Sequence, residues 1–382
     1  MRLDRSIQLV IIGIRIWLKC LILVKKQLEI LSDEKLGDTF KMKISILCSD
    51  GSPLGVTSRT IWGDEFRMGI GGAELGLLTM CEEWRKAEHE IVLFNDPHKY
   101  GDSPFEQRAV AAFDPGEDRD ILIIFRTPNM RVLTAKGLKV WWSTDQFTSR
   151  NFKEFAPVVD KIVCISPYHQ KYFAETYGIT NTVFIDLPVR VDDYKDKKYE
   201  KIPYRIIFTS VPARGLDNLC RMYPALKQRI PELSLVITSD YRLWGMSSGG
   251  NEKFRPRWVD YNGVDFLGAV PREQLIQEEL SAEAMLYPCN YEELFCISVA
   301  EAQFAGAYPI TSSIGALGTT NMGMPIGIDP NNPHDDITFI NALVDLFADR
   351  TKLQALQEEI AEKAYNRFRP EVILKQWDKV FE

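Results

Sequence analysis

The feature that most constrains this chain is a regular alternation, from Met42 onward, of short apolar runs with longer amphipathic stretches. Such alternation indicates βαβ units and parallel sheets, because each crossover helix buries its apolar face against the strands. The expected strands form two series, Lys43–Cys48, Ile91–Phe94, Ile121–Phe125, Lys139–Trp142 and Lys161–Ile165, then Tyr204–Thr209, Leu233–Thr238, Asp265–Leu267, Ala284–Tyr287 and Tyr308–Thr311. The pattern therefore predicts an α/β protein with two doubly wound, Rossmann-like sheets.

A charged segment, Pro188 to Pro203, separates the two series. It is bounded by prolines and poor in apolar residues, which is typical of a linker. The chain has 382 residues, enough for two cores, since single cores rarely grow past roughly 250 residues. We expect a first domain at 42–195 and a second at 203–368, with a break at Arg369-Pro370 before a last helical segment, 371–382.

The first 41 residues differ from the rest of the chain. Residues 1–26 carry six Lys or Arg and one acid, and the apolar stretch Ile7–Val24 contains Arg15 and Lys19. These charges make it a poor membrane-spanning helix, whereas a basic amphipathic helix suits an anionic membrane surface. Three interpretations stay open: an upstream extension or disordered tail, a peripheral helix that contacts the membrane through residues 1–26, and a signal anchor.

Composition excludes several classes of function. The 46 Lys and Arg against 53 Asp and Glu give a net charge of −7, so no global basic field is available to hold nucleic acid. The seven cysteines are scattered without a C-x-x-C pair and are expected to be reduced thiols of a cytoplasmic protein. The four histidines have no metal-binding spacing, so we expect no metal site.

The segment from Tyr287 to Ile310 carries the most informative pattern. It is expected to run from a strand end through a loop at Asn290–Leu294 into a helix and then the next strand. Glu293 lies in the loop and Glu301 about two turns into the helix. Both carboxylates can therefore face one crevice at the carboxyl end of the sheet.

The start of the same helix is suited to an anion. Its first N–H groups, around Phe295, Cys296 and Ile297, lack partners within the helix and form the positive end of its dipole. Carboxylates for sugar hydroxyls beside amides for a diphosphate are what a nucleotide-sugar pocket requires.

Three motifs together carry a resemblance to a known family. Glu293-x7-Glu301, with Phe295 and a trailing Glu-Ala-x-x-Ala-Gly, resembles the signature of retaining glycosyltransferases of family 4 (group 1), which have the GT-B fold. Gly71-Gly72-Ala73-Glu74 resembles that family's first-domain Gly-Gly-x-Glu loop. The stretch from Ser210 to Leu219 resembles the second-domain loop that usually carries Lys-Gly, here Arg214-Gly215. The resemblance extends from Met42 to the C-terminus.

The resemblance implies a hexosyltransferase of glycan biosynthesis that uses a nucleotide-diphosphate sugar, a glycan or lipid acceptor, and no cofactor or metal. It implies that Glu301 binds the ribose, Glu293 the donor sugar, and the amides of Phe295, Cys296 and Ile297 the sugar or phosphates. It assigns Arg214 to the departing diphosphate and Gly71, Gly72, Ser210 and Gly215 to donor binding. It also implies that the last helix crosses back to the first domain.

The sequence departs from the family pattern in two places. The usual Arg before the Lys-Gly pair is absent, with Thr209 near its position. The family's first-domain histidine is also absent, and in the matching loop, Trp142–Gln146, Asp145 is the only candidate. Two alternatives therefore stay open: a sugar-nucleotide epimerase of the same architecture, and a non-catalytic protein that binds a sugar nucleotide or a partner.

Other conspicuous residues are expected to be structural. Asp118-Arg119-Asp120 matches a metal-binding Asp-x-Asp of another glycosyltransferase fold, but it directly precedes a strand and is assigned to a turn. Trp141 and Trp142 are expected in a strand core, and His169 on a helix surface.

Overall fold

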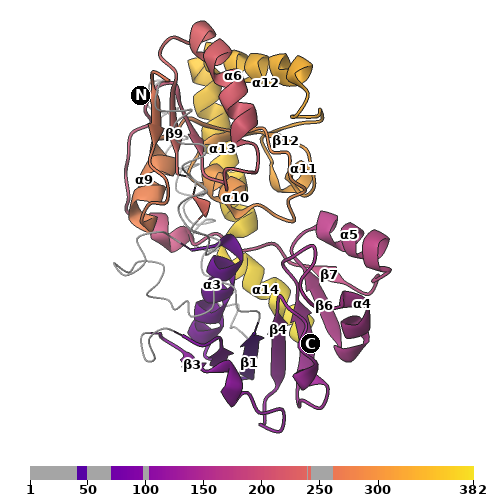
Figure 1. The fold of residues 1–382 in the computed structure, drawn as a ribbon. Helices are drawn as coiled ribbons and strands as arrows, with labels where there is room; N and C mark the ends of the chain where they lie inside the picture. Colours follow the sequence, from indigo (N-terminus) through magenta and orange to yellow (C-terminus); the bar gives the residue numbers. More distant parts are fainter. Residues whose placement is uncertain (1–40, 50–69, 98–102, 239, 242–260) are drawn as a thin grey trace, which may run out of the picture. The chain divides into compact units, whose positions relative to one another are not determined.

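The computed structural model describes residues 41–49, 70–97, 103–238, 240–241 and 261–382. The interpretations proposed for residues 1–40 concern a segment outside these ranges. The described chain is α/β and contains two separate parallel sheets (Figure 1). Within the described residues, no helix is long and apolar enough to cross a membrane.

The first sheet has seven strands among the described residues, in the order β3-β2-β1-β4-β5-β6-β7, and every neighbouring pair is parallel. Its strands are β1 Lys43–Cys48, β2 Glu90–Phe94, β3 Glu106–Arg108, β4 Ile121–Phe125, β5 Leu138–Trp142, β6 Lys161–Cys164 and β7 Val183–Phe184. Ile44 of β1 lies opposite Ile91 of β2 and Ile121 of β4. All five residues of β4 are buried, because helices cover both faces of a parallel sheet.

The second sheet has six strands in the described part of the chain, in the order β10-β9-β8-β11-β12-β13, again all parallel. Its strands are β8 Arg205–Phe208, β9 Ser234–Ile237, β10 Val264–Phe266, β11 Ala284–Tyr287, β12 Tyr308–Ser312 and β13 Met324–Ile326. We call β1–β7 with the helices between them the first half, and β8–β13 with theirs the second half. The two doubly wound sheets predicted from the sequence are confirmed.

Each expected strand forms, with ends that differ by one residue at most. Three strands were missed: β3, β7 and β13. They are two or three residues long and lie at sheet edges, so they leave too short an apolar run in the sequence to be noticed.

Helices connect the strands in both halves. The first half contains α3 Gly72–Lys86, α4 Phe152–Phe155 and α5 Pro167–Tyr177. The second half contains α6 Leu216–Arg229, α9 Arg272–Ser281, α10 Ile297–Phe304 and α11 Leu317–Thr320, followed by α12 Asp336–Ala348 and α13 Arg350–Phe368.

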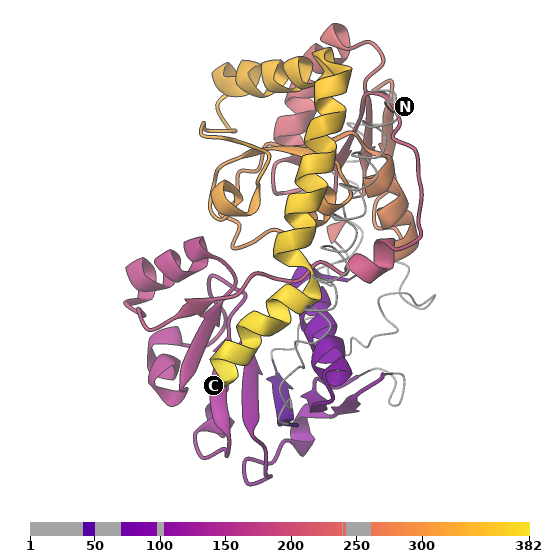
Figure 2. The same ribbon diagram turned by 180° about the vertical axis from the view of Figure 1, so that it is seen from behind.

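The last helix, α14 Pro370–Phe381, packs against the first half. It follows α13 after a break at Arg369 and lies along α3, as both views show (Figures 1 and 2). Trp377 of α14 contacts Trp84 of α3 and Trp142 of β5, with ring centroids 5.3 and 4.9 Å apart. All three indoles are buried, so this aromatic cluster anchors α14.

The expected linker is partly buried. A short 3₁₀ helix, Val191–Tyr194, interrupts it and buries Asp193 and Tyr194. Asp193 pairs with Arg190 at 3.2 Å and with Arg272 of α9 at 3.0 Å. Arg190 also pairs with Glu82 of α3 at 2.8 Å. Two charged residues of the expected linker, Arg190 and Asp193, therefore link α3 of the first half to α9 of the second through ion pairs.

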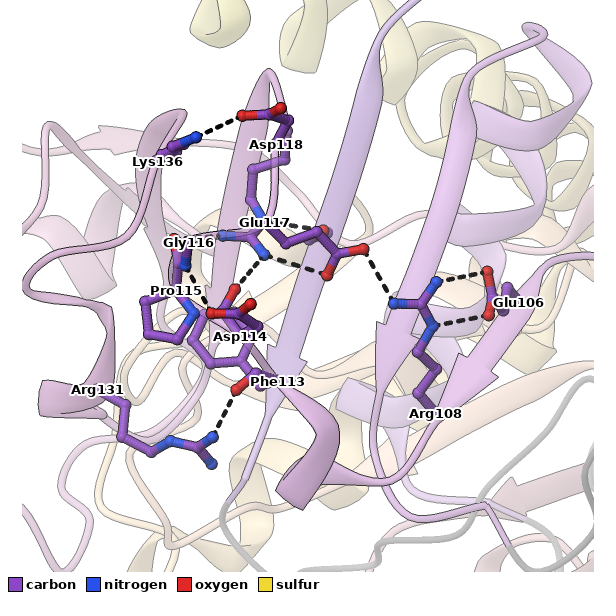
Figure 3. A network of polar contacts seen from close by, with 12 residues as sticks. Glu106, Arg108, Phe113, Asp114, Pro115, Gly116, Glu117, Asp118, Arg131 and Lys136 are labelled. Atoms are coloured by element: carbon purple, nitrogen blue, oxygen red, sulfur yellow. Dashed lines mark hydrogen bonds and ion pairs between the residues drawn. The ribbon is translucent and has the colours of Figure 1, made fainter.

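A polar network surrounds the start of β4 (Figure 3). Arg108 of β3 binds both carboxylate oxygens of Glu106 and donates to Glu117 at 3.0 Å, while Lys136 pairs with Asp118 at 2.6 Å. The side chain of Arg119 is fully buried and donates to the carbonyl of Asp114 at 2.7 Å. Asp118 and its neighbours thus secure a turn that leads into the sheet.

Of the remaining structural assignments, one is confirmed and one is wrong. Trp141 and Trp142 are buried in the core, as expected for β5. His169 is not on a surface: it is completely buried in α5, and its Nδ1 accepts from the backbone N–H of Ile165 at 3.3 Å. Burial lowers the pKa of His169 to about 3, so its imidazole is neutral. The described cysteines form no disulfide.

Candidate active site

A cavity of about 420 Å³ lies where loops of the two halves meet. Its walls follow the carboxyl ends of β4, β5, β8 and β11, which is where open α/β sheets bind ligands. The first half contributes Gly71, Gly72, Ala73, Glu74, Arg126, Thr144, Asp145, Gln146, Ile165 and Leu187, and the second half Thr209, Ser210, Val211, Arg214, Tyr291, Glu293, Leu294, Phe295, Cys296, Ile297 and Ser298.

Glu293 is buried in the wall of this cavity by specific contacts. The Tyr287 hydroxyl, at the end of β11, donates to Glu293 Oε1 at 2.8 Å. Burial and the Glu293 carboxylate raise the pKa of Tyr287 well above its usual value, so this hydroxyl remains protonated. Ser210 lies 2.9 Å from the same hydroxyl. The Glu293 carboxylate is therefore held in a fixed position.

Arg214 is the cation nearest to Glu293. Its Nη1 donates to both carboxylate oxygens, at 2.9 and 2.8 Å. Its guanidinium carbon also lies 4.2 Å from the centroid of the Tyr291 ring. Burial is the largest single influence and lowers the pKa of Arg214, but Glu293 together with Tyr287, Tyr291 and Cys296 raises it by more, so the net shift is upward. Arg214 is thus a permanent positive charge in the cavity wall.

Gly215 lets this cation approach the end of β11. Its φ of +107° is a conformation that favours glycine. A Cβ at this position would lie 2.9 Å from the carbonyl carbon of Pro288, closer than real Cβ atoms pack, and 3.0 Å from the Cα of Cys289. Gly215 itself does not line the cavity; it lets the loop that carries Arg214 pack against the strand end.

The start of α10 faces the Gly-Gly loop of the first half. Cys296 precedes this helix with φ +74°, and Phe295 packs on Phe368 with ring centroids 5.7 Å apart. A Cβ on Gly72 would collide with the side chain of Ile297, so only glycine permits this close approach. The loop at Gly71–Gly72 and the N-terminus of α10 therefore adjoin each other in the wall of one cavity.

Arg126 is a cavity residue of the first half that the sequence motifs did not single out. It follows β4 with φ +62° and lines the cavity. Its guanidinium binds Asp145 through two bonds of 2.8 and 3.1 Å and also pairs with Glu74. Asp145, the candidate from the sequence, thus lies in the cavity wall. The only signal in the sequence was a charged residue directly after a fully apolar strand.

Glu301 lies apart from the residues above. It is buried in α10, does not line the cavity, and pairs with Arg272 of α9 at 2.6 Å. Because Arg272 also pairs with Asp193, Glu301 is connected to the buried part of the linker. Nine of the eleven predicted site residues therefore line one cavity. Gly215 adjoins Arg214 without lining the cavity, and Glu301 is buried next to Arg272 instead.

The architecture is that of the GT-B fold. It has two parallel sheets, a cavity at the carboxyl ends of their strands, and a last helix that returns to the first half. Comparison with solved structures agrees. A glycosyltransferase from Rickettsia africae superposes with a TM-score of 0.67 at 14% identity, over 90% of this chain and 98% of that one. Anabaena HepE, solved with UDP and glucose, gives a TM-score of 0.60 at 16% identity, over 89% and 99%.

Sequence comparison gives one informative relative. The glycosyltransferase YqgM of Bacillus subtilis, described as uncharacterized, is 23% identical over 236 residues. The match covers 58% of this chain and 61% of that protein. No family model matches the chain. The chain is thus a GT-B-fold protein that is similar to glycosyltransferases.

Proposed function

We propose that the chain is a retaining glycosyltransferase of family 4 that moves a hexose from a nucleotide-diphosphate sugar to a hydroxyl of a glycan or lipid acceptor. The observation that carries this proposal is the pairing of Arg214 with Glu293 near the N-terminus of α10, in a cavity that Gly71 and Gly72 also line. A cation and helix N–H groups suit a diphosphate, and an adjacent carboxylate suits sugar hydroxyls.

The proposed reaction breaks the bond between the sugar's anomeric carbon and the diphosphate oxygen and forms a bond from that carbon to the acceptor oxygen. In same-face attack, the acceptor's proton passes to the departing diphosphate, so no protein nucleophile or general base is required. Arg214 and the amides at Phe295–Ile297 would stabilise the negative charge of the leaving group. The engagement of Glu293 by Arg214 supports a role in binding and orientation for this carboxylate.

Arg126 provides a second cation in the same cavity. The family's usual Arg is replaced near Thr209, and its histidine is absent from Trp142–Gln146. Arg126 enters from the first half and is paired with Asp145 and Glu74. We assign this group of three side chains to the hydroxyls of the bound sugars, because it presents both N–H donors and carboxylate acceptors.

Glu301 remains our proposed ligand for the ribose. Its carboxylate is held by Arg272, so ribose hydroxyls would have to bind the carboxylate within or beside this ion pair. UDP is the first nucleotide to test, because HepE was solved with it. A peripheral membrane contact of residues 1–26 would suit a lipid acceptor, and that segment lies outside the described residues.

The test combines binding with product analysis on the full chain. Unfolding temperature is measured with UDP, GDP, ADP and their sugar conjugates, for the wild type and for Glu293→Gln, Arg214→Ala and Glu301→Ala. A ligand at 100 times its dissociation constant stabilises the folded state by about 2.7 kcal/mol, which a thermal shift detects. Glu292→Gln is the matched control, because Glu292 is the exposed neighbour of Glu293.

The sugar nucleotide that stabilises the protein is then incubated with candidate glycan and lipid acceptors. A transferase releases free nucleotide and gives a glycoside whose anomeric configuration, read by NMR, matches the donor. An epimerase would return a changed sugar still attached to the nucleotide. Binding without either product would support the non-catalytic alternative, and no binding by any nucleotide would contradict the donor site.

A further inference from the structure

We propose that Tyr291 is a positioning residue for the leaving group: the face of its ring holds the Arg214 guanidinium in place while the N–H edge of Arg214 binds the donor diphosphate. This inference rests on the proposed function and assigns a role to a residue outside the recognised motifs. Tyr291 lies in the loop between β11 and α10, lines the cavity, and is 37% exposed.

The geometry is that of a cation over an aromatic face. The Arg214 guanidinium carbon lies 4.2 Å from the centroid of the Tyr291 ring, well inside the roughly 6 Å range of cation–π attraction. Arg214 closes a turn that begins at Val211, because its backbone N–H donates to the carbonyl of Val211 at 2.9 Å. A tight turn thus fixes the backbone, and the ring constrains the far end of the side chain.

The contact with Tyr291 differs in kind from the contact with Glu293. The carboxylate binds the N–H edge at Nη1, which is the part of a guanidinium that also binds phosphate. A bound diphosphate would therefore compete with Glu293 for Arg214. The Tyr291 ring contacts the face of the guanidinium and uses none of its N–H donors, so the ring can stay in contact with Arg214 when a diphosphate binds.

This difference matters because an arginine released from a carboxylate would otherwise gain rotamer freedom. Restricting that freedom before the reaction lowers the entropy that must be lost when leaving-group charge develops. Tyr291 is itself held by its loop, since its carbonyl accepts from the Glu293 N–H at 2.8 Å. One loop therefore places both the carboxylate and the ring that bear on Arg214.

The test uses two substitutions at Tyr291. Tyr291→Phe keeps the ring face and removes the hydroxyl, while Tyr291→Leu removes the ring. Tyr291 is partly exposed, so neither change opens the core. We expect Tyr291→Phe to stay within about twofold of wild type in kcat, and Tyr291→Leu to lose about 5- to 30-fold, which corresponds to a cation–π contact of ordinary strength.

Two further measurements isolate the route through Arg214. In an Arg214→Ala background, Tyr291→Leu should cause no additional loss of kcat, because the ring no longer has a cation to hold. Binding of UDP should weaken in Tyr291→Leu while binding of uridine does not, since only the diphosphate engages Arg214. UDP is replaced by GDP or ADP, with the matching nucleoside, if one of these is the nucleotide that binds.

The outcomes separate this proposal from the proposed function. Three results would each overturn the positioning role. The first is a loss of kcat in Tyr291→Leu that stays the same without Arg214. The second is an equal loss of kcat in Tyr291→Phe and Tyr291→Leu, and the third is unchanged binding of the nucleotide diphosphate in Tyr291→Leu. Failure of the proposed function has a different signature: the wild type itself binds none of the nucleotide diphosphates. If the wild type binds the nucleotide but transfers no sugar, the positioning role of Tyr291 is still tested by comparing how Tyr291→Leu changes the binding of UDP and of uridine.

Discussion

Replacing Gly215 by alanine tests whether the Arg214 loop packs against the end of β11 as closely as the structure shows. Gly215 has φ +107°, and a Cβ there would lie 2.9 Å from the Pro288 carbonyl carbon. Gly178 is a matched control, because it has φ +69° and a Cβ there would meet nothing within 4 Å. Both substitutions place an alanine at positive φ, and only Gly215→Ala adds a steric clash with backbone.

The expected magnitudes follow from these two terms. A left-handed conformation costs an alanine about 1–2 kcal/mol, and the stiffer unfolded chain returns roughly 0.4–1 kcal/mol. Gly178→Ala should therefore lower the free energy of unfolding by about 1 kcal/mol. Gly215→Ala must also push backbone away, which adds about 1–3 kcal/mol by the usual cost of overpacking.

Urea denaturation of the two variants measures the difference, and nucleotide release measures its effect on the site. We expect Gly215→Ala to lose about 2–4 kcal/mol and most of its transferase activity, because displacing the loop moves Arg214 away from Glu293. Gly178→Ala should keep wild-type activity. Equal and small losses of stability for the two variants would show that the loop does not contact the strand end in this way.

Three other perturbations have defined outcomes. Burial raises the pKa of Glu279 to about 8, whereas the same carboxyl in the unfolded chain titrates near pH 4.3. The folded protein therefore keeps a proton that the unfolded chain releases, and the free energy of unfolding falls as the pH rises from about 4.3 to about 8. Glu279→Gln should therefore gain stability over wild type from pH 5 to 8 in urea unfolding, whereas the exposed Glu273→Gln on the same helix should show no such trend. Arg126→Lys should lower the free energy of unfolding by about 1–3 kcal/mol and reduce sugar transfer, because lysine cannot replace the paired bonds to Asp145. A variant with wild-type kcat/KM would contradict the role of Arg126. Trp377→Ala should lower the free energy of unfolding by about 3–5 kcal/mol by loosening α14, and a loss below 1 kcal/mol would refute the anchoring role of the tryptophan cluster.

The sheets were predictable because their central strands are buried on both faces. A run such as Ile121–Phe125 has no polar position, and only a covered parallel strand tolerates that pattern. The edge strands β3, β7 and β13 were not predictable. Each is a strand because it hydrogen-bonds to one neighbouring strand, and its own two or three residues show no strand pattern.

The residues of the candidate site also fall into those that local sequence patterns identified and those that only contacts between distant residues reveal. Glu293, Arg214 and the Gly71–Gly72 loop were identified from local motifs, and the cavity contains them. Arg126 and Tyr291 were not identified, because their importance lies in contacts with distant residues: Arg126 binds Glu74, which is 52 positions away. His169 was misplaced for a similar reason, since a polar residue on an amphipathic helix gives no sign of what covers it.

By itself, the sequence determined where most strands and helices form, where the two sheets separate, and which two loops hold the carboxylate and the arginine. These properties depend on hydrophobic periodicity and on motifs within a few residues. Only the tertiary structure decided that Arg214 pairs with Glu293, that Glu301 turns toward Arg272, and that the charged linker is partly buried. Each of these depends on which opposite charge lies within about 4 Å once burial has removed water, and that distance is set by the packing of the whole chain.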